Sequence, residues 1–442
     1  MASKIKKSVV IIGGGFAGTT VASHLDPHIP EDWQVILLSK ENYITFNPLL
    51  AEVVGASIPP SHVVAPIRQM VKNVDFRMVN VTDIDLQTRT IYYLGEGGGS
   101  IEYDQLVLAC GNRANLDLIP GMGDYALPLK TVGDALFLRN RITVRLEQAE
   151  LQQDAEARRW LTTFIVIGGG FSGVEIAGEI DDFLHVAIPY YPNLRYEDCK
   201  VILLHAMEHL LPELPPKLGD AAQKRMRKHI DIRVNSIATR VDDRGVELKS
   251  DERVNGGTII CTIGNAPSHL IDSLPLPKNR GRLETNPDMS VKTHPGIWAI
   301  GDCAIIPNEY DGQLAPPTAQ FAVREGMQLA NNLIRRMAGN ATKPFHYKPI
   351  GMLASIGHYK AVAEIMGLHI SGFIAWLLWR AVYLAKIPTL ARKVRLFGEW
   401  NWQLLFARDI VHMHYQRTKR AAPIPSSNKG NPTVIKQEEI SH

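Results

Sequence analysis

Two stretches of the chain share one pattern of apolar and polar positions. Each begins with a continuous run of apolar, mostly β-branched residues, passes through a cluster of glycines and then becomes compatible with a helix. They span residues 8–18 and 163–173, and a second apolar run follows each, at 35–38 and 201–204. Continuous apolar runs are typical of parallel strands that are buried on both faces. The pattern therefore predicts two β-turn-α-β units in one chain.

The remaining segments complete an α/β pattern. Short alternating segments between the two units, punctuated by the glycines of residues 95–99, predict a small antiparallel meander. Residues 281–302 return to a strand-like pattern, and residues 318–337 have the period of a helix. We therefore predict two Rossmann-type dinucleotide-binding domains.

The pattern changes again near residue 371. Residues 371–387 and 398–406 are rich in Trp, Phe and Leu, and residues 371–420 hold nine Lys or Arg against two acidic residues. Apolar helix faces with basic borders suit a membrane interface, where tryptophan lies at the headgroup level. The pattern predicts a C-terminal amphipathic helical membrane-anchoring segment. A dimer interface or a buried helix pair would produce the same composition.

Composition narrows the classes of function. The 442 residues exceed the ~250–300 at which one core stops growing, so at least two domains are expected. A net charge of +3 without a basic, aromatic-rich run argues against a nucleic-acid partner. The four cysteines form no CxxC pair or metal-ligand spacing, so reduced thiols and no metal site are expected. No stretch reaches the ~18 uncharged apolar residues of a membrane span.

The glycines of the two units have the spacing of a phosphate-binding loop. In G-x-G-x-x-G the first glycine allows a tight turn, the second lets the backbone approach a pyrophosphate, and the third lets the helix pack against the strand. The helix N-terminus then presents free N–H groups to the phosphates. Two such loops, each between strands, predict two dinucleotide sites. They are formed by Gly13, Gly15 and Gly18 and by Gly168, Gly170 and Gly173.

The second strand of such a unit usually ends in an acidic residue that binds a ribose hydroxyl. Here Ser39 ends the first unit and His205 ends the second. Serine can still hydrogen-bond a ribose. Histidine removes the charge that would repel a 2′-phosphate, so the sequence leaves both NADH and NADPH open.

Several motifs resemble those of type II NADH:quinone oxidoreductases, which are two-dinucleotide-binding-domain flavoproteins. The resemblance covers residues 8–412 and rests on the two glycine loops, residues 299–302 (AIGD), residues 42–50 (NYITFNPLL), residues 315–326 (APPTAQFAVREG) and residues 173–179 (GVEIAGE). Residues 103–111 and 259–264 resemble the strands that link the two domains. Arg324 departs from the A-Q-x-A-x-Q-x-G motif, which has glutamine there.

The resemblance implies a glutathione-reductase-like fold with three sets of binding residues. FAD is expected to contact Gly13, Gly15, Phe16, Ala17, Gly18, Ser39, Lys40, Pro48, Ala109, Gly111, Gly301, Asp302, Ala319 and Gln320. NADH or NADPH is expected to contact Gly168, Gly170, Phe171, Ser172, Gly173, Glu175, His205 and Gly264. The quinone is expected to meet Phe46, Pro48, Gln320 and Arg324.

The implied reaction moves a hydride from nicotinamide to flavin and then two electrons to a membrane quinone, without proton pumping. Glu175 and Gln320 are the candidate catalytic residues. We place Glu175 in the first helical turn, where the helix dipole would keep it ionised. Glu179 lies one turn further on, and a structural role is the favoured interpretation.

The implied organisation is discontinuous. Residues 1–125 and 285–365 are expected to form the FAD-binding domain, residues 126–284 the NAD(P)H-binding domain, residues 366–415 the membrane-surface or dimer segment, and residues 416–442 a disordered tail. We expect a peripheral homodimer on the cytoplasmic face of the inner (plasma) membrane.

Three other classes share the fold. A sulfide:quinone oxidoreductase needs a redox-active cysteine pair beside the flavin, and the sequence places none there. A soluble NAD(P)H-dependent ferredoxin or disulfide reductase would not need residues 371–406. A flavoprotein that acts as a binding or signalling module would bind FAD and turn over slowly.

Overall fold

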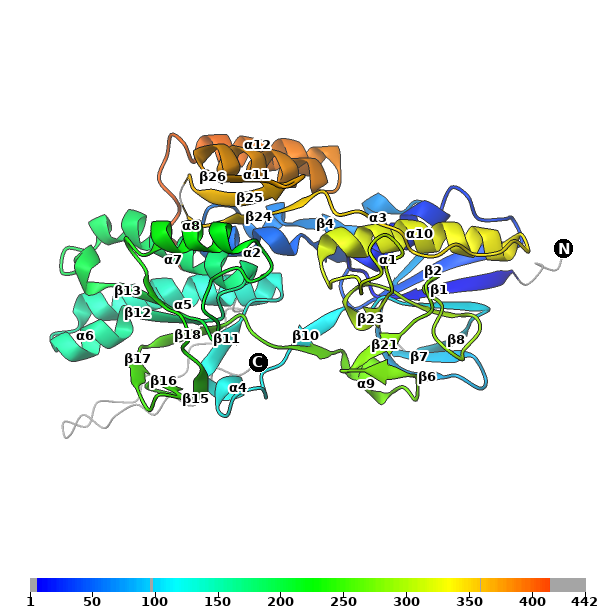
Figure 1. The fold of residues 1–442 in the computed structure, drawn as a ribbon, viewed down its shortest axis with the longest axis horizontal. Coiled ribbons are helices and arrows are strands. Elements are labelled where there is room, and N and C mark those ends of the chain that lie inside the picture. Colours follow the sequence, from blue (N-terminus) through cyan, green and yellow to red (C-terminus); the bar gives the residue numbers. More distant parts are fainter. Residues whose placement is uncertain (1–5, 96–97, 358, 414–442) are drawn as a thin grey trace, which may run out of the picture.

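The computed structural model describes residues 6–95, 98–357 and 359–413. Two halves, each built on a parallel sheet, lie side by side, and a C-terminal unit covers the junction between them (Figure 1). The predicted α/β fold with two Rossmann-type sheets is confirmed. The predicted tail at residues 416–442 lies outside the described residues.

The first sheet has the strand order β22-β9-β1-β2-β5, and every neighbouring pair is parallel. Edge strand β22 comes from much later in the chain than the other four strands, so residues before 109 and after 296 share one sheet. Helices α1 and α10 pack together on it, and the meander β6-β7-β8 forms as predicted. The elements are β1 Lys7–Ile12, α1 Phe16–Leu25, β2 Trp33–Ser39, β3 Tyr43–Thr45, α2 Leu50–Val54, β4 Val64–Pro66, α3 Ile67–Met70, β5 Asp75–Met78, β6 Asn80–Asp85, β7 Thr90–Leu94, β8 Gly99–Glu102, β9 Gln105–Leu108, α9 His269–Ser273, β20 Lys278–Asn279, β21 Arg282–Glu284, β22 Ile297–Ala299, β23 Ala304–Ile305 and α10 Ala319–Met337.

The second sheet repeats this design in the order β11-β18-β12-β13-β14, again all parallel. Strand β10 pairs with β19 where the chain crosses between the halves. The elements are β10 Asn112–Ala114, α4 Met122–Tyr125, β11 Ala126–Pro128, α5 Val132–Leu151, α6 Ala155–Leu161, β12 Thr163–Ile167, α7 Phe171–Ala187, β13 Lys200–Leu204, α8 Pro216–Met226, β14 Asp231–Arg233, β15 Ala238–Asp242, β16 Gly245–Leu248, β17 Arg253–Asn255, β18 Thr258–Cys261 and β19 Asn265–Pro267.

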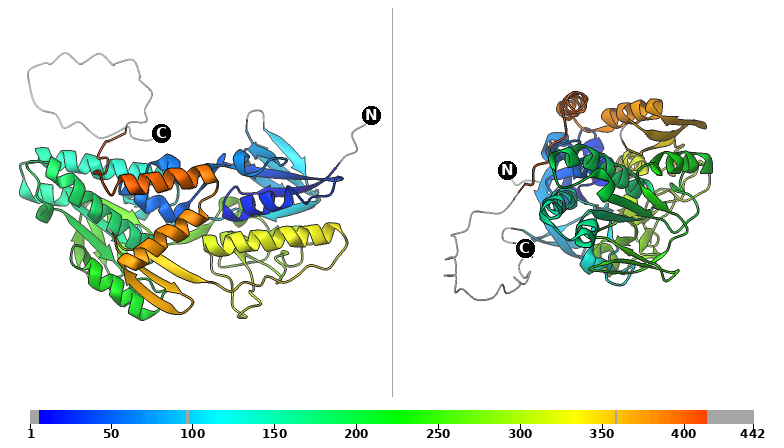
Figure 2. Two further views of the ribbon diagram at one scale, coloured as in Figure 1. Left: turned by 90° about the horizontal axis from the view of Figure 1, so that it is seen from above. Right: turned by 90° about the vertical axis from the view of Figure 1, so that its left-hand side faces the viewer.

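The C-terminal unit is a three-stranded antiparallel sheet followed by two helices. It comprises β24 Gly351–Ser355, β25 Ala361–Ile365, β26 Leu368–Gly372, α11 Phe373–Lys386 and α12 Leu390–Trp402. The predicted boundary at residue 366 falls between β25 and β26, within this sheet. The two helices lie side by side on one face of the molecule (Figure 2). No helix in the described part of the chain is both long and apolar enough to cross a bilayer.

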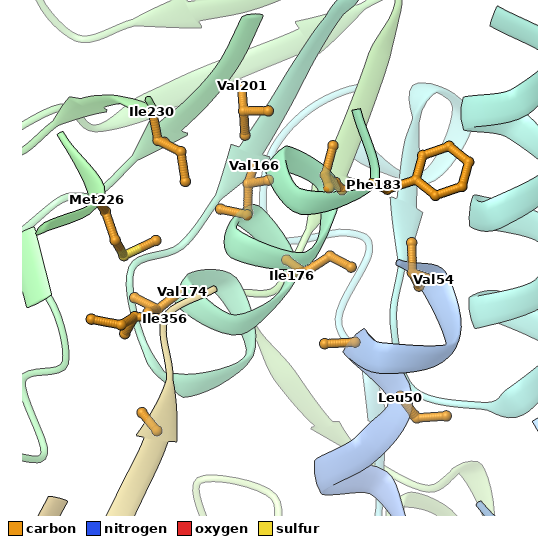
Figure 3. Close-up of a cluster of buried hydrophobic side chains, with 14 of the residues drawn as sticks. Leu50, Val54, Val166, Val174, Ile176, Phe183, Val201, Met226, Ile230 and Ile356 are labelled. Atoms are coloured by element: carbon orange, nitrogen blue, oxygen red, sulfur yellow. The ribbon is translucent and has the colours of Figure 1, made fainter. Parts of the chain in front are cut away.

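One hydrophobic core joins all three parts. Side chains of α2, from the first half, pack against α7 of the second half, and the end of β24 closes the same cluster (Figure 3). Leu50 and Val54 of α2 lie beside Ile176 and Phe183 of α7. This shared core fixes the two glycine loops relative to each other.

Candidate active site

The first glycine loop, residues 13–18, connects β1 to α1 and requires its glycines. Gly13 has φ +115°, and a β-carbon there would lie 2.1 Å from the Ala109 carbonyl oxygen. A β-carbon on Gly18 would lie 1.9 Å from the Gly13 carbonyl oxygen. Gly15 faces open space instead, directly before the N-terminus of α1. The loop therefore fits a pyrophosphate at its second glycine.

The second glycine loop, residues 168–173, has the same geometry. Gly168 has φ +116°, and a β-carbon on Gly173 would lie 1.7 Å from the Gly168 carbonyl oxygen. Helix α7 begins at Phe171, and Ser172 is exposed beside it. The two loops occupy equivalent places, each at the carboxyl end of the middle strand of its sheet, and they differ at the second glycine, where a β-carbon on Gly170 would lie 3.4 Å from Glu213 Oε1.

Ser39 and His205 occupy equivalent places under these loops. Both are buried. Each lies against the central residue of the three consecutive glycines in its loop, Ser39 against Gly14 and His205 against Gly169. His205 Nδ1 accepts a hydrogen bond from the Gly169 N–H at 3.1 Å, so a neutral ring carries its proton on Nε2. Burial lowers the His205 pKa. Nε2 has no hydrogen-bond partner among the described residues, which leaves a buried donor free for a ligand oxygen.

Asp302 lies at the carboxyl edge of the first sheet, as the pairing of β1, β9 and β22 requires. Its Oδ2 accepts a hydrogen bond from Asn112 Nδ2 at 2.9 Å, and burial raises the Asp302 pKa. Gly301 has φ +72° and Gly111 has φ +61°, so both turns favour glycine. The parallel register brings together Gly13, Ala109, Gly111 and Gly301, which the sequence had placed 288 positions apart at the extremes.

Glu325 is a buried site residue that the sequence did not single out. Its Oε2 accepts a hydrogen bond from the Gly301 N–H at 2.7 Å, and burial raises its pKa to about 7. It stands inside the 315–326 motif between Arg324 and Gly326, and this position was the available signal. Glu325 holds the turn that carries Asp302.

A row of aromatic rings connects the first glycine loop to the C-terminal helices. Phe16 contacts Phe46 with ring centroids 5.7 Å apart, and Phe46 contacts Tyr383 of α11 at 5.9 Å. Trp379 continues the row, 4.8 Å from Tyr383 and 6.0 Å from Trp400 of α12. We call these five rings the aromatic row. Of the five rings, the sequence predicted only Phe16 and Phe46 as site residues, because the row joins residues more than 300 positions apart.

Glu175 is buried beside this row. Its Oε1 accepts a hydrogen bond from the Ser355 N–H at 3.3 Å. Burial raises the pKa of Glu175 to about 8, the Ser355 hydrogen bond opposes the rise, and the charge of Glu52 adds to it. The negative charge of Glu175 in turn contributes to a raised pKa at Tyr383, after burial.

The expectation that Glu175 stays ionised was wrong. Helix α7 begins at Phe171, which makes Glu175 the fifth residue of the helix and places it beyond the first turn. The helix dipole acts mainly within that turn, so the cost of burying the charge dominates.

The predicted quinone residues divide between two places. Gln320 donates a hydrogen bond from Nε2 to the Tyr347 hydroxyl at 2.6 Å, and Arg324 lies over the same ring at 5.3 Å. Burial and the neighbouring Arg324 lower the pKa of Lys386, which ends α11. Phe46 lies instead in the aromatic row, and Pro48, two residues further along the chain, is half-buried. Helix α11 links the places, because Tyr383 is one turn from Lys386.

The remaining residues that the sequence predicts to contact a cofactor lie at the ends of helices and strands. Ala17 is buried, whereas Lys40 is exposed at the end of β2. Ala319 is the first residue of α10, and Gly264 has φ +78° in the turn after β18.

A buried acid cluster lies behind Glu175 and ties the C-terminal unit to both halves. Arg408 Nη1 donates to Glu179 Oε2 at 2.9 Å and to the Gly55 carbonyl oxygen at 3.0 Å. Its Nη2 lies 3.6 Å from Asp182 Oδ2. Trp400 donates to Glu52 at 2.8 Å. Glu179, Asp182, Glu52 and Arg408 form this cluster, and the structural role of Glu179 stays a prediction.

The four cysteines form no disulfide. All lie in the described part of the chain and are free thiols. Cys110 and Cys303 sit in the strand ends beside the first glycine loop, and burial raises both pKa values, that of Cys303 to about 12. Thiols that remain protonated are poor nucleophiles, so this arrangement does not support sulfide chemistry.

The fold and site define the class of protein. The sequence profile of the pyridine nucleotide-disulphide oxidoreductases matches residues 7–326, and that of the NDH2 C-terminal domain matches residues 350–409. NDH2 from Plasmodium falciparum, solved in complex with NADH, superposes with a TM-score of 0.85 at 21% identity, over 92% of this chain and all of that chain. The chain is therefore a member of the pyridine nucleotide-disulphide oxidoreductases.

Comparison with curated relatives identifies the family within that class. The type II NADH:quinone oxidoreductase NdhA of Mycobacterium tuberculosis is 31% identical over 416 residues, which cover 89% of this chain and 86% of NdhA. The mitochondrial internal alternative NAD(P)H-ubiquinone oxidoreductase A1 of Arabidopsis thaliana is 28% identical, over 92% of this chain and 85% of its own length. The chain belongs to the type II NADH:quinone oxidoreductases, which confirms the resemblance seen in its motifs.

Proposed function

We propose that this protein is an FAD-dependent NAD(P)H:quinone oxidoreductase that does not pump protons. The observation that carries this proposal is the pair of equivalently placed glycine loops, one on each parallel sheet, with buried Glu175 and the aromatic row near them. Family membership supplies the same reaction independently. When bound, the flavin supplies the chemistry that passes two electrons from nicotinamide to quinone.

The chain's own residues bind, orient and hold protons. The first glycine loop with Ser39 and Asp302 would hold FAD, and the second with His205 would hold the nicotinamide nucleotide. Glu175 would keep a proton available at neutral pH, because burial raises its pKa to about 8. Gln320 and Arg324 can donate hydrogen bonds to a quinone carbonyl, and Phe46 with Pro48 would wall the ring.

The test is steady-state oxidation of NADH and of NADPH by the flavin-loaded protein, with and without a short-chain quinone. We expect rapid oxidation that requires quinone. Bound FAD that neither nucleotide reduces would contradict the proposal.

We expect His205 to set the nucleotide preference. His205→Asp would place a carboxylate where NADPH carries its 2′-phosphate, and a repulsion of ~1.4 kcal/mol already lowers kcat/KM about tenfold. NADH should be affected far less, since a carboxylate can accept from its ribose hydroxyl. The ratio of the two kcat/KM values measures the effect. His205→Gln keeps a neutral donor and is the matched control; an equal loss with both nucleotides in His205→Asp would contradict this role.

The C-terminal helices support a peripheral place on a membrane surface. Large apolar side chains remain exposed along both helices, among them Phe373, Ile374, Leu377, Leu390, Val394, Phe397 and Trp402. Arg392, Lys393 and Arg395 border this face on α12. We propose that it lies on the lipid bilayer at the cytoplasmic face of the inner (plasma) membrane, where the membrane quinone dissolves, and that the protein is a homodimer.

Charged substitutions on this face should release the protein from lipid. Leu390 and Val394 lie one turn apart on α12 and are 76% and 63% exposed. The double variant Leu390→Glu/Val394→Glu should lose co-flotation with anionic vesicles and keep oxidation of a water-soluble quinone. Leu151→Glu, at an 80% exposed site on α5, is the control. Retained flotation with a change from dimer to monomer would instead identify this face as the subunit interface.

A further inference from the structure

A cluster of metal-ligating side chains lies in the second half, on the far end of α7 from the glycine loop. It joins Asp181 and His185 of α7 with His229, in the turn between α8 and β14. One carboxylate oxygen and one nitrogen of each ring all lie within 4.8 Å of one another. We propose that these three residues bind a divalent transition metal, Zn²⁺ above all, with water completing the coordination.

The donor set fits this class of ion. Two imidazoles and one carboxylate are ligands that Zn²⁺ prefers, at about 2.0–2.2 Å, with a water in the fourth tetrahedral position. Mg²⁺ and Ca²⁺ require oxygen ligands and would find only one carboxylate here. Asp181 and His185 stand four residues apart and so share one face of α7. His185 and His229 are exposed, which lets their rings make the small closing movement that bonding distances require.

A second layer of contacts already orients the ligands. His185 Nδ1 donates to the Asp181 carbonyl oxygen at 2.9 Å and lies 3.7 Å from Asp181 Oδ1, so a neutral ring keeps its free lone pair on Nε2. The Tyr196 hydroxyl donates to Asp181 Oδ1, and the Tyr196 ring lies 3.9 Å from that of His185. Such outer hydrogen bonds fix the orientation and tautomer of ligands in metal sites. The site would cross-link α7, which begins at the second glycine loop, to the turn after α8.

The test uses the flavin-loaded full chain, freed of metal by a chelator and carrying no polyhistidine tag. We expect calorimetric titration to show one equivalent of Zn²⁺ bound at micromolar concentration and no binding of Mg²⁺. Co²⁺ should give a tetrahedral ligand-field band at wavelengths beyond the flavin absorption. Zinc should also raise the melting temperature.

Variants locate the metal. His185→Gln and His229→Gln should each weaken binding more than tenfold, and Tyr196→Phe should weaken it roughly tenfold. His209→Gln is the matched control, because His209 also faces two carboxylates, Asp220 and Glu208, yet lies outside the cluster. Equal melting temperatures in chelator would show that the variants fold. Absence of zinc binding, or binding that survives in the His185→Gln/His229→Gln double variant, would overturn the proposal.

Discussion

Arg408→Met is expected to lower the free energy of unfolding by about 3–5 kcal/mol, the usual cost of leaving a buried charge without its partner. Arg408 is only 10% exposed and Glu179 8%, so solvent screens their ion pair weakly. The charges of Glu179, Asp182 and Glu52 raise the Arg408 pKa against the opposing effect of burial. Methionine keeps the apolar stem and removes the charge. Chemical denaturation, monitored through the release of the flavin, measures the loss in the free energy of unfolding.

Two further variants separate charge from packing. Adding Glu179→Gln to Arg408→Met removes the uncompensated carboxylate and should recover part of the stability. Arg233→Met breaks two more exposed pairs, with Asp231 and Glu252, and should cost only about 1 kcal/mol. If the double variant is as unstable as the sum of its single changes, Arg408 stabilises the protein through packing and not through its charge.

The glycine loops could be predicted from sequence because their physics is local. Gly18 is required by a contact with Gly13, five positions away, and Gly13 by its own φ of +115°, and the strand before them is a continuous apolar run. The same holds for Gly168 and Gly173. Local spacing was therefore enough to predict both β-turn-α-β units and their glycine loops.

The environment of the site could not be predicted in this way. Arg408 and Glu179 are 229 positions apart, and Glu175 receives its hydrogen bond from Ser355, 180 positions away. The pKa of a buried group is raised or lowered by the residues packed around it. The periodicity of the sequence carries no information about partners that lie so far apart in the chain. This is why nothing in the sequence indicated that burial raises the pKa of Glu175, and why the carboxylate of Glu325 was overlooked.

The metal cluster illustrates the same limit. Asp181 and His185 share a helix face that can be read from spacing, but His229 is 44 positions further on and follows another helix. The expectation of no metal site came from cysteine spacing alone. Only the tertiary fold of the second half brings the second imidazole to the first.

Glu175→Gln is expected to lower kcat with quinone by about 10²-fold, the lower end of what general acid–base catalysis contributes. The wild-type carboxyl has a pKa of about 8 because burial disfavours its charged form. It therefore holds a proton at pH 7, and turnover should decline as pH rises through about 8. Glutamine has nearly the same size but no titratable proton, so the low kcat of the variant should be independent of pH in this range.

The free energy of unfolding supplies a second measurement of the Glu175 proton. A residue with a merely structural role would change the free energy of unfolding without changing the pH dependence of kcat. Unfolded Glu175 would titrate near 4.5, so between pH 4.5 and about 8 the folded chain holds a proton that the unfolded chain has released. The stability contributed by this group is complete below the unfolded pKa and declines with rising pH, by up to about 1.4 kcal/mol per unit, until the folded pKa. Glu175→Gln should flatten that decline, whereas Glu156→Gln, at an exposed position on α6, should leave both readouts unchanged. A Glu175→Gln protein that keeps wild-type kcat and its pH profile would remove Glu175 from the reaction and leave it as a buried helix residue.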